Sequence, residues 1–275
     1  PKEGTYDWAL FDKLIDGARA KGLSVLAVIG YTPAWASSAN VDGKESSNDV
    51  PRPGFYEKFV TAAVTRYRDR VDHWELWNEP NVRQFWTGSQ AQWMDRILRP
   101  GIDAIRALRA DPVGISPAKI FAPSVYINYD QNRPLTVSSW ISGYESAIDV
   151  VAVHTYGSED TQVAEIHDMG AWCELHPTCL QFQVTAAGFQ STDCAQHYCP
   201  VAVGPALLRT QNACRNTPWC FGNFIANLRD GTIGSGLLTS QDQVRSRLCY
   251  LEERYGPPLA LAAPCPCWPG KPGCE

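Results

Sequence analysis

The chain has 275 residues, of which 44% are hydrophobic and 19% charged, so it is long enough to bury a sizeable core within one large domain. Its formal net charge of −5 offers no basic footprint, which disfavours nucleic acid and anionic membranes as partners. No run of residues reaches the ~18 apolar positions of a membrane-spanning helix, so we expect no membrane insertion.

Strand and helix patterns alternate along the chain. Short apolar runs predict buried strands at residues 23–30, 73–78, 120–125, 148–154, 180–185 and 221–228. Apolar residues at helical spacing predict helices at residues 10–18, 55–70, 90–109, 137–146, 161–173, 200–213 and 241–255. The third helix should break or kink near Pro100. This alternation predicts a parallel α/β fold whose site lies at the carboxyl ends of the strands.

The strand at residues 73–78 is the centre of the functional prediction. It is dense in aromatic residues and is ended by Pro80, which cannot extend a central ladder. Asn78 and Glu79 stand at its end with tryptophans close by. A sugar site needs aromatic faces, an amide for a hydroxyl and a carboxyl group for proton transfer. The other interpretation is a tryptophan-rich core strand that ends in a turn.

The cysteines point to an oxidising compartment. All ten lie from Cys173 onward, in sequence rich in turn formers, and none has the spacing of a zinc site. An even number in loops indicates disulfides, so we expect a secreted, periplasmic or cell-surface protein and no metal. Proximity suggests the pairs Cys173–Cys179, Cys194–Cys199 and Cys214–Cys220.

Six short motifs resemble clan A glycoside hydrolases, a set of TIM-barrel families that includes families 39 and 5. They are YDW at 6–8, YTPAWA at 31–36, WELWNEPN at 74–81, HTY at 154–156, VTAAG at 184–188 and NLRDG at 227–231. The resemblance implies a TIM-type (β/α)8 barrel over residues 1–256, followed by a disulfide-pinned tail at 257–275. It also implies two strands before the YDW motif. Either these belong to a preceding piece of the full protein, or something else covers the gap, because six strands cannot close such a barrel.

The same resemblance implies the catalytic roles. Glu79 would be the general acid/base, and Asn78 would hold the sugar 2-hydroxyl. The seventh barrel strand of the family carries the nucleophilic glutamate, and Ala186 occupies that position here. A methyl group cannot attack carbon, so the chain as written should be close to inert as a retaining hydrolase. Either a glutamate was replaced by engineering, or the protein is a natural pseudoenzyme that binds glycans.

Further candidates come from strand ends and loops. The resemblance implies that Tyr156 hydrogen-bonds the nucleophile and that His154 lines the site, whereas the alternative is a satisfied polar pair. Trp35 is the candidate sugar-stacking platform with Tyr31 nearby, unless both are ordinary barrel packing. Trp86, in the loop after the Glu79 strand, is expected to form a subsite wall rather than part of the core.

These observations predict a retaining, endo-acting O-glycoside hydrolase for a β-linked polysaccharide or oligosaccharide. No cofactor or metal is implied, since acid/base and nucleophilic chemistry suffice. An inverting mechanism with Glu79 and Asp230 is conceivable but has no other support in the sequence. The rival interpretations are a non-catalytic glycan-binding protein on this scaffold and an extracellular structural domain without a sugar site.

Overall fold

A computed structural model describes residues 3–39, 47–110, 118–127, 133–188 and 200–225 of the chain. Its residues divide into two compact units. Unit 1 comprises Pro1–Val153 with Pro177–Gln181, and unit 2 comprises His154–His176 with Phe182–Glu275. No helix within the described ranges is long and apolar enough to cross a membrane.

Unit 1 alternates helices and parallel strands. Its elements are α1 (Ala9–Ala20), β1 (Leu26–Ile29), α2 (Phe55–Tyr67), β2 (His73–Leu76), α3 (Gln90–Trp93), α4 (Arg99–Arg109), β3 (Lys119–Tyr126), α5 (Arg133–Ile141) and the first residues of β4 (Val150–Tyr156). The strands are neighbours in chain order, with Ile29 of β1 opposite Leu76 of β2 and Glu75 of β2 opposite Phe121 of β3. Parallel neighbours need crossover connections, and the intervening helices provide them.

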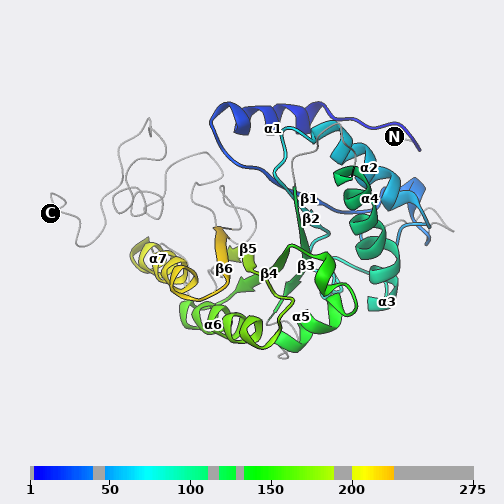
Figure 1. The fold of residues 1–275 in the computed structure, drawn as a ribbon. Helices are drawn as coiled ribbons and strands as arrows, with labels where there is room; N and C mark the ends of the chain where they lie inside the picture. Colours follow the sequence, from blue (N-terminus) through cyan, green and yellow to red (C-terminus); the bar gives the residue numbers. More distant parts are fainter. Residues whose placement is uncertain (1–2, 40–46, 111–117, 128–132, 189–199, 226–275) are drawn as a thin grey trace. The chain divides into compact units, whose positions relative to one another are not determined.

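The core of unit 1 lies between these strands and helices. Phe121, Val150 and Ala152 are fully buried and pack with Leu26. Helices α2 and α4 lie side by side (Figure 1). A glycine permits the close approach of α4 to the sheet, because a Cβ atom at Gly101 would lie 2.9 Å from a methyl group of Leu76.

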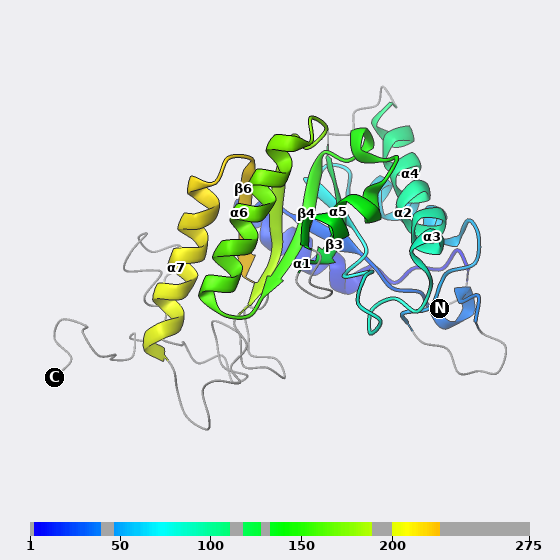
Figure 2. The ribbon, with the colours of Figure 1, turned by 90° about the horizontal axis from the view of Figure 1, so that it is seen from below.

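Unit 2 contains the end of β4, α6 (Glu159–Leu175), β5 (Phe182–Gly188), α7 (Pro200–Asn216) and β6 (Cys220–Ile225). Helices α6 and α7 pack side by side in both views (Figures 1 and 2). The Ser158 hydroxyl caps α6 by accepting the N–H of Thr161 at 3.2 Å. A disulfide between Cys214 and Cys220 joins the end of α7 to the start of β6.

The predicted alternation is confirmed, but element ends differ. The strand that begins at His73 stops at Leu76, because the backbone of Trp77 turns to a left-handed conformation (φ 71°). The irregularity expected near Pro100 is a π-helical segment, Met94–Leu98, and Pro100 itself lies in the first turn of α4. Proline is tolerated there because the first N–H groups of a helix need no intrahelical partner.

Several predictions lie outside the described residues. These are the NLRDG motif, the helix at 241–255, the tail at 257–275 and the pair Cys194–Cys199. The pair Cys214–Cys220 is confirmed. Cys173 and Cys179 are both disulfide-bonded, and their pairing with each other stays a prediction.

Candidate active site

Glu79 lies in a strained turn at the carboxyl end of β2. Its side chain is buried, with 5% of its surface exposed, and its backbone φ is 43°. Trp77 is also left-handed, and each such non-glycine residue costs roughly 1–3 kcal/mol and persists only where the surrounding structure holds it in place. The Glu79 N–H donates to the Ser124 carbonyl oxygen at 2.9 Å, which holds the turn against β3. Strain of this kind concentrates at functional sites.

The turn is tied down by two further side chains. Asn81 donates its amide N–H to the Tyr126 carbonyl at 2.9 Å and accepts the Tyr126 N–H at 3.1 Å. The indole N–H of Trp77 donates to the Phe85 carbonyl at 2.9 Å. Sequence reasoning did not assign Asn81 a role, although it lies in the WELWNEPN motif. Nothing in the sequence marks Ser124, whose left-handed backbone (φ 59°) supports Glu79 from β3.

Tyr31 reaches the same site from the end of β1. Its backbone is left-handed (φ 72°). Burial raises the pKa of Tyr31, the nearby Glu79 carboxyl raises it further, and the nearby Asn78 side chain acts in the opposite direction by lowering the pKa of the hydroxyl. The structure therefore brings Tyr31, Asn78 and Glu79 together within unit 1, as a phenol, an amide and a carboxyl group.

The two predicted tryptophans differ in position. Trp35 lies on a short 3-10 helix, Ala34–Ala36, and is half-buried. Trp86 is only 1% exposed, which corrects the expectation that it forms a subsite wall. Its ring meets Trp77 edge-on at 5.2 Å, and its N–H donates to the Ser89 carbonyl at 3.0 Å. The loop after β2 folds back on itself, so this loop aromatic becomes a core residue.

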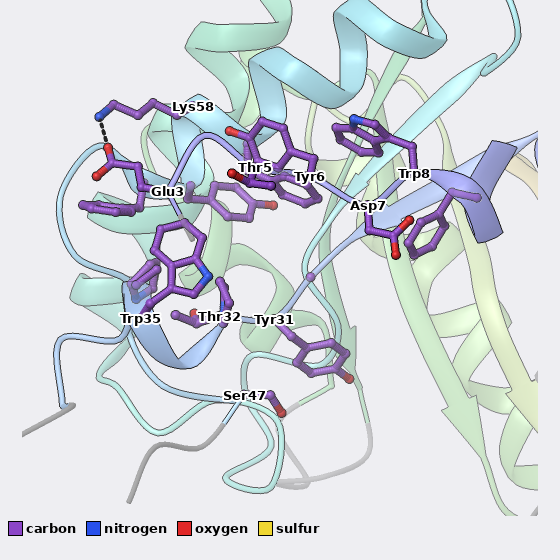
Figure 3. A pocket seen from close by; sticks show the side chains of 18 residues that line it. Glu3, Thr5, Tyr6, Asp7, Trp8, Tyr31, Thr32, Trp35, Ser47 and Lys58 are labelled. Carbon is purple, nitrogen blue, oxygen red and sulfur yellow. Dashed lines mark hydrogen bonds and ion pairs between the residues drawn. The ribbon is translucent and has the colours of Figure 1, made fainter. Parts of the chain in front are cut away.

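A cavity of about 420 Å³ lies beside Tyr31 in unit 1 (Figure 3). It is lined by the segment before α1, the residues after β1 and the first turns of α2. Trp35 and Tyr31 both line it. Their rings are thus accessible from a concave surface, as a stacking platform requires.

In unit 2, His154 and Tyr156 end β4. His154 is 3% exposed, and its ring meets that of Tyr156 edge-on at 6.3 Å. Ala186 is half-buried on β5, next to an irregularity in the ladder. Val184 pairs with Asn223 and Ala187 with the residue two further along β6, so β5 carries an extra residue between them. Such bulges redirect a side chain and are frequent beside active sites.

Gln162 of α6 ties the ends of β4 and β5 together. Its amide N–H groups donate to the carbonyls of Gly157 at 3.2 Å and Gly188 at 3.1 Å. The Gly157 N–H also donates to Gly188 at 3.3 Å. Sequence reasoning missed Gln162, because a single glutamine on a helix carries no signal of such a contact. Asp230, the carboxyl group of the inverting alternative, lies outside the described residues.

No family model matches the chain. Its structure is similar to a β-xylosidase from Caulobacter crescentus CB15, with 19% identity and a TM-score of 0.68 over 91% of this chain and 57% of that one. A family 39 glycoside hydrolase from Bacteroides cellulosilyticus WH2 is also similar, with 17% identity and a TM-score of 0.68 over 90% of this chain and 53% of that one. A thermostable mutant of a xylanase from Cellvibrio japonicus is similar as well, with 15% identity and a TM-score of 0.62 over 92% of this chain and 84% of that one.

The chain has the fold of clan A glycoside hydrolases. The resemblance predicted from the sequence motifs is thereby confirmed at the level of fold. The parallel strands with alternating helices correspond to part of the (β/α) barrel of these enzymes. The chain spans little more than half of the length of the β-xylosidase (57%) and of the family 39 glycoside hydrolase (53%) to which it is similar.

Proposed function

We propose that this protein is an O-glycoside hydrolase domain of the retaining type. Its substrate would be a β-linked polysaccharide or oligosaccharide, which it would cleave at internal glycosidic bonds. The observation that carries the proposal is Glu79, held buried and strained at a strand end beside Asn78 and Tyr31. The similar structures include a β-xylosidase and xylanases, so xylan and xylo-oligosaccharides are the first substrates to test.

Each residue of this group has a task in the proposed reaction. The Glu79 carboxyl donates a proton to the glycosidic oxygen as its bond to the anomeric carbon breaks, and in the second step it takes a proton from water. The Asn78 amide holds the sugar 2-hydroxyl. Trp35 offers a face for the apolar side of a sugar ring. His154 and Tyr156 are proposed to contact the sugar and the nucleophile position from the end of β4.

Ala186 occupies the position at which the family carries its nucleophile, so the proposed enzyme lacks the carboxylate that would attack the sugar. Retention needs two carboxyl groups ~5–5.5 Å apart, one of which attacks carbon. We therefore expect the chain as it stands to bind glycans and to cleave them very slowly. Either a glutamate was replaced at this position, or the protein is a natural glycan-binding pseudoenzyme.

The test is to introduce Ala186→Glu and assay it against xylans, β-glucans, mannans and bacterial exopolysaccharides. A gain of several orders of magnitude on one polymer, absent from the matched Ala186→Gln variant, would support the retaining mechanism. Adding Glu79→Gln to Ala186→Glu should abolish that gain. Folded Ala186→Glu protein that neither binds nor cuts any glycan would refute the proposal.

Azide rescue separates the two origins of Ala186. If a carboxylate was merely deleted, azide can enter its space and release an inverted glycosyl azide from an activated aryl glycoside. A natural binder with a remodelled pocket should show no rescue while still binding the glycan. Each result therefore selects one of the two origins.

We also propose that the complete barrel has eight strands. The described residues form six, and Val28 of β1 has 53% of its surface exposed, on the face of the strand opposite to Ile29. On α1, Leu10, Phe11 and Leu14 are 63%, 53% and 59% exposed. Two further β/α units would cover these side chains and protect the edge of β1, which pairs with no other strand than β2 within the described ranges. The disulfides support the proposal that the protein is exported to an oxidising compartment.

A further inference from the structure

The side chain of Gln162 clamps the ends of β4 and β5 to each other. Helix α6 packs against β5 (Figures 1 and 2), and Gln162 lies in its first turn, where the Gln162 backbone N–H donates to the Ser158 carbonyl at 3.1 Å. The Gln162 Nε2 atom donates to the carbonyls of Gly157 at 3.2 Å and Gly188 at 3.1 Å. One amide group thus holds both the residue that follows β4 and the last residue of β5.

The backbone around this clamp is closely determined. Gly157 has a φ of 121°, which residues with a side chain rarely adopt, and its N–H donates to the Gly188 carbonyl at 3.3 Å. The Gly188 carbonyl therefore accepts one hydrogen bond from the end of β4 and one from α6. Because the Ser158 hydroxyl caps α6, the first turn of the helix is a fixed base from which Gln162 reaches both carbonyls.

Stability alone does not account for the amide group. The Gln162 side chain is fully buried, and its Oε1 atom accepts no hydrogen bond from the residues that the structure describes. A buried acceptor without a donor loses its hydration, which offsets much of the stabilisation from the two donated hydrogen bonds. What the amide supplies is a fixed geometry between the two strand ends.

The clamp lies next to the candidate site residues of unit 2. Tyr156 directly precedes Gly157, and Ala186 lies two residues before Gly188. The ladder between β5 and β6 is irregular around Ala186, so pairing with β6 alone leaves the position of this residue loosely determined. The Gly188 carbonyl, held by Gln162, is the nearest fixed point further along the strand.

We propose that Gln162 is a positioning residue that sets the spacing between Tyr156 and the side chain at position 186. In the proposed retaining reaction a carboxylate at position 186 attacks the anomeric carbon, and a displacement of about 1 Å can cost about 100-fold in rate. Gln162 acts through the two strand ends, because its amide nitrogen is occupied by the two glycine carbonyls. The catalytic part of this inference rests on the proposed function, whereas the clamp itself does not.

Hydrogen exchange of the full chain, followed by NMR, tests the clamp without any assay of activity. Gln162→Met has a similar shape but removes both donated hydrogen bonds, so exchange at the Gly157 N–H should become about tenfold faster or more. The control is Thr217→Val, which removes a buried hydroxyl that donates to the Ala213 carbonyl at 2.7 Å. Thr217 lies before the amino end of β6, away from the carboxyl ends of the strands, and its loss should leave the Gly157 exchange unchanged.

A second variant covers the case in which Gln162→Met does not fold. Gln162→Asn keeps the amide but shortens the side chain by one methylene group, so it cannot hold both carbonyls. It should raise the exchange rate at the Gly157 N–H in the same direction, with a circular dichroism spectrum like that of the unaltered chain.

Kinetics in the Ala186→Glu background test the positioning role. Adding Gln162→Met should lower kcat about 10- to 100-fold on the polymer that Ala186→Glu cleaves, and change KM less than about threefold, because it displaces the attacking carboxylate rather than the sugar contacts. Adding Thr217→Val should lower Tm but leave kcat unchanged. This comparison separates positioning from general destabilisation.

The possible outcomes are distinct. Unchanged exchange at the Gly157 N–H in the folded Gln162 variants would overturn the clamp. Faster exchange with an unchanged kcat, or a loss of kcat no larger than that of Thr217→Val, would overturn the positioning role. If Ala186→Glu cleaves no glycan while exchange in the Gln162 variants is faster, the proposed function and the catalytic role of Gln162 fail together and only the clamp stands.

Discussion

Asn81 is expected to hold the Glu79 turn in place. Replacing it by alanine removes two hydrogen bonds to the Tyr126 backbone, at 2.9 and 3.1 Å. Each partly buried hydrogen bond contributes about 1 kcal/mol net, so Asn81→Ala should lower the free energy of unfolding by about 2 kcal/mol. In a domain of this size that corresponds to a fall of about 4–8 °C in Tm.

Urea denaturation followed by tryptophan fluorescence measures this change. The matched control is Gln84→Ala in the same loop, where the side chain is exposed and only the backbone carbonyl accepts a hydrogen bond. That control should stay within about 0.5 kcal/mol of the unaltered chain. Equal stability of the Asn81 and Gln84 variants would refute the reasoning. In the Ala186→Glu background, Asn81→Ala should lower kcat more than it raises KM, because it loosens the acid/base rather than the sugar contacts.

Two further predictions concern unit 1. The Arg66 guanidinium, 2.5 Å from Asp12, lowers the pKa of that carboxyl against the opposing effect of burial. Because the folded pKa lies below the unfolded one, this stabilisation is present at neutral pH and is lost as pH falls through the folded value. Asp12→Asn should therefore lower the urea midpoint at pH 7, and the difference between the variant and the unaltered chain should shrink as the pH is lowered into the range in which Asp12 becomes protonated. A difference that stays constant throughout acid titration would contradict the ion pair. Trp86→Ala should cost about 3–5 kcal/mol by leaving a cavity, with no selective loss of glycan affinity in the protein that remains folded. A Trp86→Ala variant that stays stable but binds glycan more weakly would contradict this prediction and would show that Trp86 contacts the sugar.

Much of the fold was readable because its signals are local. An apolar run of strand length followed by apolar residues at helical spacing predicts a β/α unit wherever it occurs. The pairing Cys214–Cys220 was readable for the same reason, since a short loop leaves few alternatives. The position of Asn78 and Glu79 directly after a strand likewise predicted a site at the strand's carboxyl end.

The geometry of that site was not readable. Trp77 looked like a strand residue, yet its backbone turns to φ 71°. The turn that follows depends on hydrogen bonds from Glu79 to Ser124 and between Asn81 and Tyr126, and both partners belong to β3. Trp86 looked like a loop aromatic free to meet a sugar, yet it is 1% exposed. Burial of a loop residue depends on what folds over it, and no periodicity in the loop records that.

The sequence by itself determined the order of the elements, the fold class and the residues placed at strand ends. Only the tertiary structure decided that Tyr31, Asn78 and Glu79 meet, and that the segment before α1, the end of β1 and α2 enclose one aromatic cavity. The physical reason is the sequence separation between the residues that interact. Strand and helix patterns arise from neighbours a few residues apart, whereas a turn held by another strand or a cavity shared by three segments exists only after distant parts of the chain have packed.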